Sequence, residues 1–131
     1  IVMCICKEKH DWKLALHYIE KMRAENVNIQ PITLNITIDL CLKANEIEEG
    51  LILLDNASAQ SCDVTTFNTI FHTLCNDPKV EEVERVTRVY NHMISLGIHP
   101  VSRTLGILIT FYTDTKQFEI IDNLFSEYLN M

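Results

Sequence analysis

The chain has 131 residues, 47% of them hydrophobic, which is enough for one domain with a continuous core. Its three glycines, its three prolines and the scarcity of strand-like alternation favour an all-helical fold. The net charge of −7, taken alone, argues against a nucleic-acid partner, and no apolar run approaches the roughly 20 residues that span a bilayer, so no membrane partner is expected.

The predicted elements follow the apolar periodicity along the chain. The run at residues 1–6 is too short for a membrane span and lacks the flanks of a signal peptide, so we expect it to end a helix and the chain to be a segment of a longer protein. Further helices are predicted over residues 11–25, 32–43, 46–59, from 64 to the Asn76-Asp77-Pro78 stop, over 79–96, from Pro100 onward, and finally up to about residue 131.

Local signals mark the expected helix ends. Asp11, Asp63 and Ser102 are the predicted N-caps, because their side-chain oxygens can accept hydrogen bonds from backbone groups of the first turn. Asn26 and Gly97 are predicted to end helices in the left-handed conformation.

One face of each helix is predicted to be buried. From the first complete helix to the last, these faces carry Trp12, Ala15, Ile19 and Met22; Leu34, Ile38 and Cys41 or Leu42; Ile47, Leu51 and Leu54; Phe67, Ile70 and Leu74; Val80, Val83, Val86, Val89 or Tyr90, and Met93; Leu105, Ile109 and Tyr112; and Phe118, Ile121, Leu124 or Phe125, and Tyr128.

A phrase of the form Thr-Leu/Phe-Asn recurs three times. Its third residue is Asn35, Asn68 and then Gly106, at spacings of 33 and 38 residues. A period in this range is typical of stacked helical repeats. We therefore predict a single domain that is a right-handed α-solenoid of antiparallel helix pairs, with repeats at about residues 1–30, 31–63, 64–101 and 102–131.

Four segments carry a family resemblance: residues 63–70, 15–22, 43–51 and 97–100 resemble the opening, second helix, inter-helix turn and closing Gly-Ile-x-Pro loop of a pentatricopeptide repeat. The resemblance covers nearly the whole chain. It departs from the family in its spacings, which lie on either side of 35, and at Gly106, where an Asn, Thr or Ser is expected. The rival tetratricopeptide repeat has a Trp-x-x-Leu-Gly opening that is not evident here.

The resemblance implies that each repeat reads one base of single-stranded RNA with two or three side chains. Its base-reading pairs would be Asn35 with Asp63, which by resemblance favours uridine, and Asn68 with Val101; Gly106 would have its partner beyond the chain. The remaining implied RNA-binding residues are Ile32, Thr65 and Arg103 beside the bases, and Lys7 and Lys43 at phosphates, where the later repeats have Asn76 and Asp114.

The same residues have plainer interpretations. Asn35 can simply bond the first turn of its helix, and Asp63 can be an ordinary N-cap. The three complete first helices carry only Asp39, Lys43 and Arg103, so the expected groove is nearly neutral while the acidity lies on the second helices. Two functions therefore stay open: RNA binding in processing, stability or translation, or a scaffold for a protein partner.

Other chemistry is not expected. The five cysteines show no disulfide framework and predict buried free thiols in an intracellular, reducing compartment, which the family resemblance suggests is mitochondrial and which is otherwise cytoplasmic or nuclear. Cys4, Cys6 and His10, and likewise His72 and Cys75, lack the second ligand pair of a zinc site. We expect no metal, no cofactor and no enzymatic activity.

Overall fold

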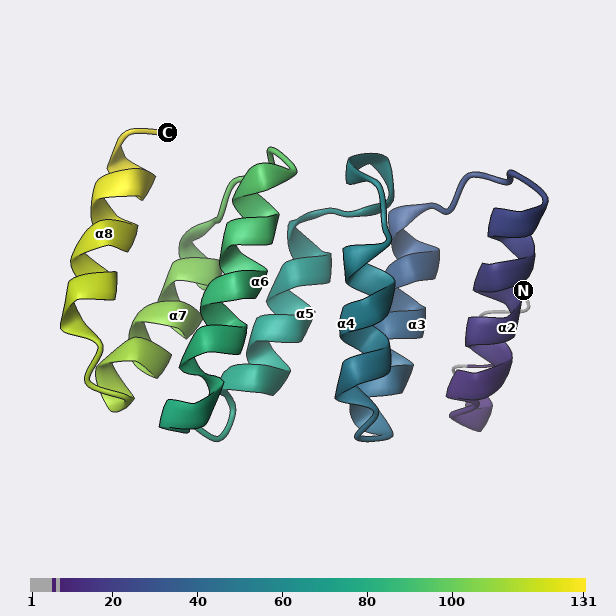
Figure 1. The fold of residues 1–131 in the computed structure, drawn as a ribbon, viewed down its shortest axis with the longest axis horizontal. Coiled ribbons are helices and arrows are strands. Elements are labelled where there is room, and N and C mark those ends of the chain that lie inside the picture. Colours follow the sequence, from purple (N-terminus) through teal and green to yellow (C-terminus); the bar gives the residue numbers. More distant parts are fainter. Residues whose placement is uncertain (1–5, 7) are drawn as a thin grey trace. The chain divides into compact units, whose positions relative to one another are not determined.

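The computed structural model describes Cys6 and residues 8–131, and every secondary-structure element within these residues is helical (Figure 1). Residues 6, 8 and 9 are helical. The elements that follow are α2 (Trp12–Ala24), α3 (Pro31–Lys43), α4 (Ile47–Asp55), η1 (Ala59–Ser61), α5 (Val64–Cys75), η2 (Val80–Glu82), α6 (Val83–Ser95), α7 (Ser102–Asp114) and α8 (Phe118–Leu129), where η marks a 3-10 turn. The all-α prediction is confirmed for this part of the chain.

Most helices end in the same way. After α2, α3, α6 and α7 a residue with positive φ turns the chain, and the next amide donates to a carbonyl one turn back, which is the Schellman arrangement. The turning residues are Asn26, Asn45, Gly97 and Lys116, with φ of 57°, 62°, 77° and 61°. The predicted left-handed ends at Asn26 and Gly97 are confirmed.

The described chain forms two compact units, residues up to 66 (unit 1) and residues 67–131 (unit 2), with the border in the first turn of α5. In unit 1, α3 packs against both α2 and α4, and it runs antiparallel to α4 (Figure 1). Because α3 has helices on two sides, it buries residues around most of its circumference rather than along one stripe. These residues are Leu34, Thr37, Ile38, Leu40, Cys41 and Leu42.

Gly50 lies in α4 where this helix faces α3. A Cβ at this position would lie 3.4 Å from Leu42 Cδ2 and 3.7 Å from Cys41 Cβ, which is ordinary van der Waals contact. An alanine would therefore fit here, and the glycine brings the usual cost of about 0.5–1 kcal/mol to the helix interior.

In unit 2, the helices are joined by polar bonds as well as apolar packing. The Thr87 and Tyr112 hydroxyls are 2.8 Å apart, and Tyr90 Oη donates to Glu127 at 2.9 Å. The Phe67 ring lies 6.2 Å from the imidazole of His92. The apolar core consists of Phe67, Ile70, Phe71, Leu74, Val86, Val89, Tyr90, Met93, Leu105, Leu108, Phe111, Tyr112 and Leu124.

The predicted helix over residues 46–59 is wrong at its end, because α4 stops at Asp55. Ser58 is extended, with ψ of 162°, and its hydroxyl lies 3.2 Å from that of Ser61 across η1. Serine hydroxyls compete for local hydrogen bonds in this manner and so favour turns over helix interiors.

The predicted N-cap at Ser102 is also wrong. Ser102 is the first residue of α7, and Val101 occupies the cap position with extended backbone. The valine has no polar side-chain atom to donate or accept. Instead, its N–H donates to Thr104 Oγ1 at 3.2 Å. Of the two reciprocal hydrogen bonds of a capping box, only the one from the backbone of the cap residue to the side chain of the third helical residue is made.

Several predicted core residues are exposed. Val80 is 65% exposed because the segment before α6 forms η2 rather than the start of the helix. Phe118 and Phe125 of α8 are 60% and 47% exposed, while Leu124 of the same helix is buried. Periodicity identifies an apolar face, but burial requires another element to pack on it.

Candidate nucleic-acid interface

Asp63 begins α5 as its N-cap, as predicted. The Thr66 N–H donates to Asp63 Oδ1 at 3.0 Å, and the Asp63 N–H donates to Thr66 Oγ1 at 3.1 Å. This exchange satisfies two backbone donors at the helix start in the manner of a capping box, with threonine as the third helical residue. The interpretation of Asp63 as an N-cap is therefore confirmed.

The same cap also holds Asn35, which lies on α3, 28 residues earlier. Asn35 Nδ2 donates to Asp63 Oδ1 at 3.1 Å, and Thr66 Oγ1 bonds Asn35 Oδ1. We call these three residues the Asn35 cluster. The two ends of the Asn35 amide are thus distinguished: the oxygen faces the threonine and the nitrogen faces the carboxylate.

The carboxyl of Asp63 is stabilised as an anion. Burial raises its pKa, but the hydrogen bonds from Asn35, Thr66 and Thr65 outweigh burial, and the net effect lowers the pKa below the ordinary value. Asp63 is exposed, so a negatively charged acceptor lies at the surface beside the Asn35 amide at neutral pH.

A second cluster with the same plan lies in unit 2. Thr104 Oγ1 donates to Asn68 Oδ1 at 2.6 Å and accepts from the Val101 N–H at 3.2 Å. We call Asn68, Val101 and Thr104 the Asn68 cluster. Its position equivalent to Asp63 is Val101, so nothing in this cluster can accept from the Asn68 amide nitrogen as the carboxylate does in unit 1.

Thr66 and Thr104 have a role that was not predicted from the sequence. Both are buried, at 1% and 0% exposure. Thr66 joins the start of α5 to Asn35 on α3, and Thr104 joins the start of α7 to Asn68 on α5. The signal was present, because threonine opens the recurring phrase each time. Without a structure, a threonine at this position was indistinguishable from a residue of ordinary helix propensity.

The other predicted RNA-contacting side chains are dispersed. Ile32, Thr65 and Arg103 are exposed, Ile32 by 69%. Lys43 is exposed, but its ammonium forms an ion pair with Asp39 at 2.9 Å, so its charge is partly neutralised within α3. Lys7 lies outside the described residues.

Gly106 opens a pocket in unit 2. A Cβ at this position would meet nothing within 4 Å, and the glycine lines a pocket of about 410 Å³ together with His72, Asn76, Thr110 and Asp114. Asn76 and Asp114, which stand where the family resemblance places a phosphate-contacting lysine, thus line the same pocket as Gly106, which stands where it places a base-reading residue. No lysine or arginine lines this pocket.

The described cysteines are free thiols, as predicted. Burial, with a smaller effect of nearby carboxylates, raises the pKa of Cys41 and Cys62 to about 11 and that of Cys75 to about 12. These thiols are therefore protonated at neutral pH and unsuited to nucleophilic chemistry. Among the residues that the structure describes, no group of three or more His, Cys, Asp or Glu side chains is placed to hold a metal ion.

No helix in the described part of the chain combines the length and apolar content needed to cross a membrane. Comparison of the sequence with protein-family models gave no match, and comparison with curated proteins gave none either.

Proposed function

We propose that this chain is an RNA-binding repeat module of the pentatricopeptide type, in which the helix pairs stack as an α-solenoid, and that it acts in RNA processing, stability or translation. The observation that supports the proposal best is the hydrogen bond between Asn35 and Asp63. These are the two side chains that the resemblance pairs for reading one base, and the fold brings them within 3.1 Å across 28 residues of sequence.

The chemistry of the Asn35 cluster suits uracil. After its bond to Asp63, the Asn35 amide nitrogen retains a second hydrogen, which can donate to a uracil carbonyl oxygen. The Asp63 carboxylate can accept the uracil N3–H. Cytosine has a lone pair at N3 instead of a hydrogen, so the ionised carboxylate would repel it. The pKa of Asp63 lies below the ordinary carboxyl value, so the carboxylate is ionised at neutral pH, as this discrimination requires.

The charge distribution implies low affinity for RNA. Phosphate contacts supply most of the affinity for nucleic acids, and the net charge here is −7. Of the basic residues proposed to contact RNA in the described chain, Lys43 is already paired with Asp39 while Arg103 is exposed. We therefore expect the affinity for RNA to change little with salt concentration. Contacts to the bases should contribute a large share of the selectivity.

A binding titration tests the proposal. Fluorescence anisotropy with oligouridine, oligocytidine and oligoadenosine at about 50 mM salt should give tightest binding to oligouridine. Asp63→Ala should reduce the uridine preference over cytidine by about tenfold, the value of one hydrogen bond to a charged group. Asp11→Ala is the matched control, because Asp11 caps α2 through the Leu14 N–H at 3.0 Å without an asparagine partner.

Two results would reject the RNA function: no binding to any of the three oligonucleotides at that salt concentration, or equal binding of oligouridine and oligocytidine by the unmodified chain. A preference lost equally in Asp11→Ala and Asp63→Ala would assign it to general helix stability instead.

The alternative function is a scaffold that binds a protein partner. The observation in its favour is the exposed apolar face of α8, where Phe118, Phe125 and Leu129 are 60%, 47% and 78% exposed. Their spacing of seven and four residues places them on one side of the helix. Under this alternative, Phe125→Asp lowers binding of the partner and leaves the oligonucleotide titration unchanged.

A further inference from the structure

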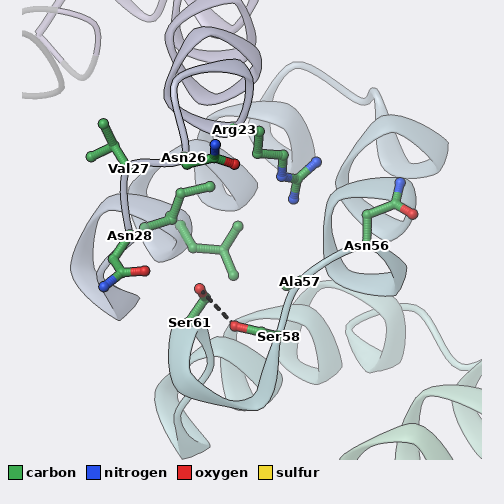
Figure 2. Close-up of a pocket in the computed structure, with 10 residues that line it drawn as sticks. Arg23, Asn26, Val27, Asn28, Asn56, Ala57, Ser58 and Ser61 are labelled. Atoms are coloured by element: carbon green, nitrogen blue, oxygen red, sulfur yellow. Dashed lines mark hydrogen bonds between the residues drawn. The ribbon is translucent and has the colours of Figure 1, made fainter.

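Unit 1 has a polar pocket whose lining includes neither Asn35 nor Asp63. Its volume is about 460 Å³, and it is bordered by the connection from α2 to α3 and the connection from α4 to α5 (Figure 2). The first connection contributes Asn26 and Asn28, and the second contributes Asn56, Ser58 and Ser61. Arg23, in the last turn of α2, extends its guanidinium into the space between them (Figure 2).

Arg23 has an unmet hydrogen-bonding requirement. Its Nη2 is buried from solvent and has no hydrogen-bond partner among the residues that the structure describes, while the residue as a whole is half-buried. Guanidinium remains protonated in proteins and can only donate, so this nitrogen cannot adapt by losing its proton. A buried charged donor without a partner is costly, so such a group calls for an explanation, and an acceptor on a bound ligand is one.

The unpartnered nitrogen of His92 differs in kind from that of Arg23. His92 Nε2 in unit 2 is also buried without a partner. An imidazole can leave one nitrogen unprotonated, so this atom needs no acceptor. His92 also packs against the Phe67 ring. Arg23 is the case that calls for an acceptor, and it lies beside a pocket with space for one.

The electrostatics of the pocket favour a ligand with one negative charge. No aspartate or glutamate lines it, so nothing in the wall neutralises Arg23. Helices α2 and α4 reach the pocket by their C-terminal ends, whose carbonyl groups carry partial negative charge. A single guanidinium opposed by two helix C-termini suits a monoanion better than a doubly charged phosphate monoester.

We propose that this pocket binds a carboxylate group, with Arg23 as its charged ligand and the side-chain amides and hydroxyls of the two connections as further donors. Guanidinium and carboxylate match as a bidentate pair. Ile29 is half-buried and lines the pocket, and so does Val27, which is 48% exposed, so an apolar body attached to the carboxylate has surface to cover. The volume falls in the range of small-molecule sites, roughly 300–1,000 Å³.

The carboxylate can belong to a small organic acid or to an acidic side chain of a peptide, and an NMR titration of the whole chain distinguishes these sources. The probes are N-acetylleucine, its uncharged amide of the same shape, a blocked peptide with a single glutamate, and inorganic phosphate. N-acetylleucine should shift the side-chain amide signals of Asn26, Asn28 and Asn56 and the Arg23 Nε–H, saturating with Kd of about 1 mM or tighter. The uncharged amide should not.

Two variants test whether Arg23 supplies the positive charge that binds the carboxylate. Arg23→Met keeps length and apolar packing but removes the guanidinium, and it should weaken N-acetylleucine binding at least tenfold. Lys21→Met, an exposed position two residues earlier on α2, is the matched control and should bind as the unmodified chain does. Without ligand, Arg23→Met should also unfold at a temperature no lower than that of the unmodified chain, because it removes a buried unpartnered N–H donor.

If Arg23→Met fails to fold, Asn28→Ala tests the same site from an exposed loop position, and it should weaken binding severalfold. The proposal is overturned by equal shifts with N-acetylleucine and its amide, by tighter binding of phosphate, or by unaltered binding in whichever of the two variants folds. A loss of oligouridine affinity in Arg23→Met, without loss in Lys21→Met, would assign the pocket to RNA phosphate instead. Failure of oligouridine binding by the unmodified chain leaves this proposal standing.

Discussion

The Asn35 and Asn68 clusters each contain a buried threonine that makes the same set of bonds, and the two clusters differ at one position. In both, a buried threonine bonds the asparagine oxygen and accepts a hydrogen bond from the N–H of the residue that precedes the threonine's own helix. In unit 1 that residue is Asp63, which also receives the asparagine nitrogen, whereas in unit 2 it is Val101. The threonine present in both clusters thus joins two helices, and the carboxylate is an addition to it.

This difference separates structure from function within one motif. A residue required only for packing should be present in both clusters, as threonine is. A side-chain cap is not needed at every helix start, since α7 starts at Ser102 without one. Selective binding is therefore expected at Asn35 and not at Asn68, and three experiments test this contrast.

The largest effect is expected from removing the threonine hydroxyls. Thr66→Val and Thr104→Val keep the side-chain shape but leave an asparagine oxygen and a backbone N–H unpaired, which should lower the free energy of unfolding by about 1–3 kcal/mol each. Urea titrations measure this. In Thr66→Val, Asn35 retains its bond to Asp63, so the uridine preference should persist; in Thr104→Val, Asn68 loses its hydrogen bond to the threonine.

Thr110→Val is the control for these variants, because Thr110 is exposed on α7 and should change stability by less than about 0.5 kcal/mol. A threonine variant as stable as this control would show that the hydroxyl bonds do not hold the clusters together.

An exchange of the differing residue should have an intermediate effect. Val101→Asp should add an N-cap to α7 and stabilise the chain by about 0.5–2 kcal/mol, and Asp63→Val should destabilise it by a similar amount. In oligonucleotide titrations, Val101→Asp should add a uridine preference and Asp63→Val should remove one. If the two changes alter stability in opposite directions but leave base preference untouched, the carboxylate is a cap and nothing more.

The smallest effect concerns pH. The lowered pKa of Asp63 means that its charged form is favoured in the folded state, so its contribution to stability is present above the ordinary carboxyl pKa of about 3.9. That contribution is lost as the pH falls through the lower pKa of the folded state. The stability difference between the chain and Asp63→Asn should therefore shrink on acidification, because asparagine caps a helix nearly as well as aspartate does.

Acid titration of unfolding, followed by circular dichroism in both proteins, measures this difference. A constant difference down to about pH 2 would show that the Asp63 carboxyl is not selectively stabilised as an anion. Asn68→Ala provides the comparison for unit 2, where no carboxylate is bonded and no acid-dependent difference is expected.

Much of the fold was predictable because its signals are local. Asp11 and Asp63 cap helices through bonds three residues away, and Asn26 and Gly97 turn the chain at positive φ. The early end of α4 was not predicted, because residues 56–60 contain no glycine or proline and the turn depends on hydroxyl bonding between Ser58 and Ser61.

The candidate site divides in the same manner. The resemblance paired Asn35 with Asp63, and the fold brings them together. The neutralisation of Lys43 by Asp39 follows a spacing of four residues that was readable in the sequence but was not used. The valine cap at residue 101 was obscured by the neighbouring Ser102, which is a better cap former by residue type alone.

The sequence by itself determined the helices, most of their ends and the recurring Thr-Leu/Phe-Asn phrase, because helix periodicity and capping depend on neighbours within one turn. Only the tertiary structure decided which partner each asparagine of that phrase meets, which apolar faces are covered, and that Arg23 is left with a buried donor beside a pocket. Those outcomes depend on groups brought together from distant parts of the chain, and a hydrogen bond or a buried charge is satisfied or not according to their positions in space.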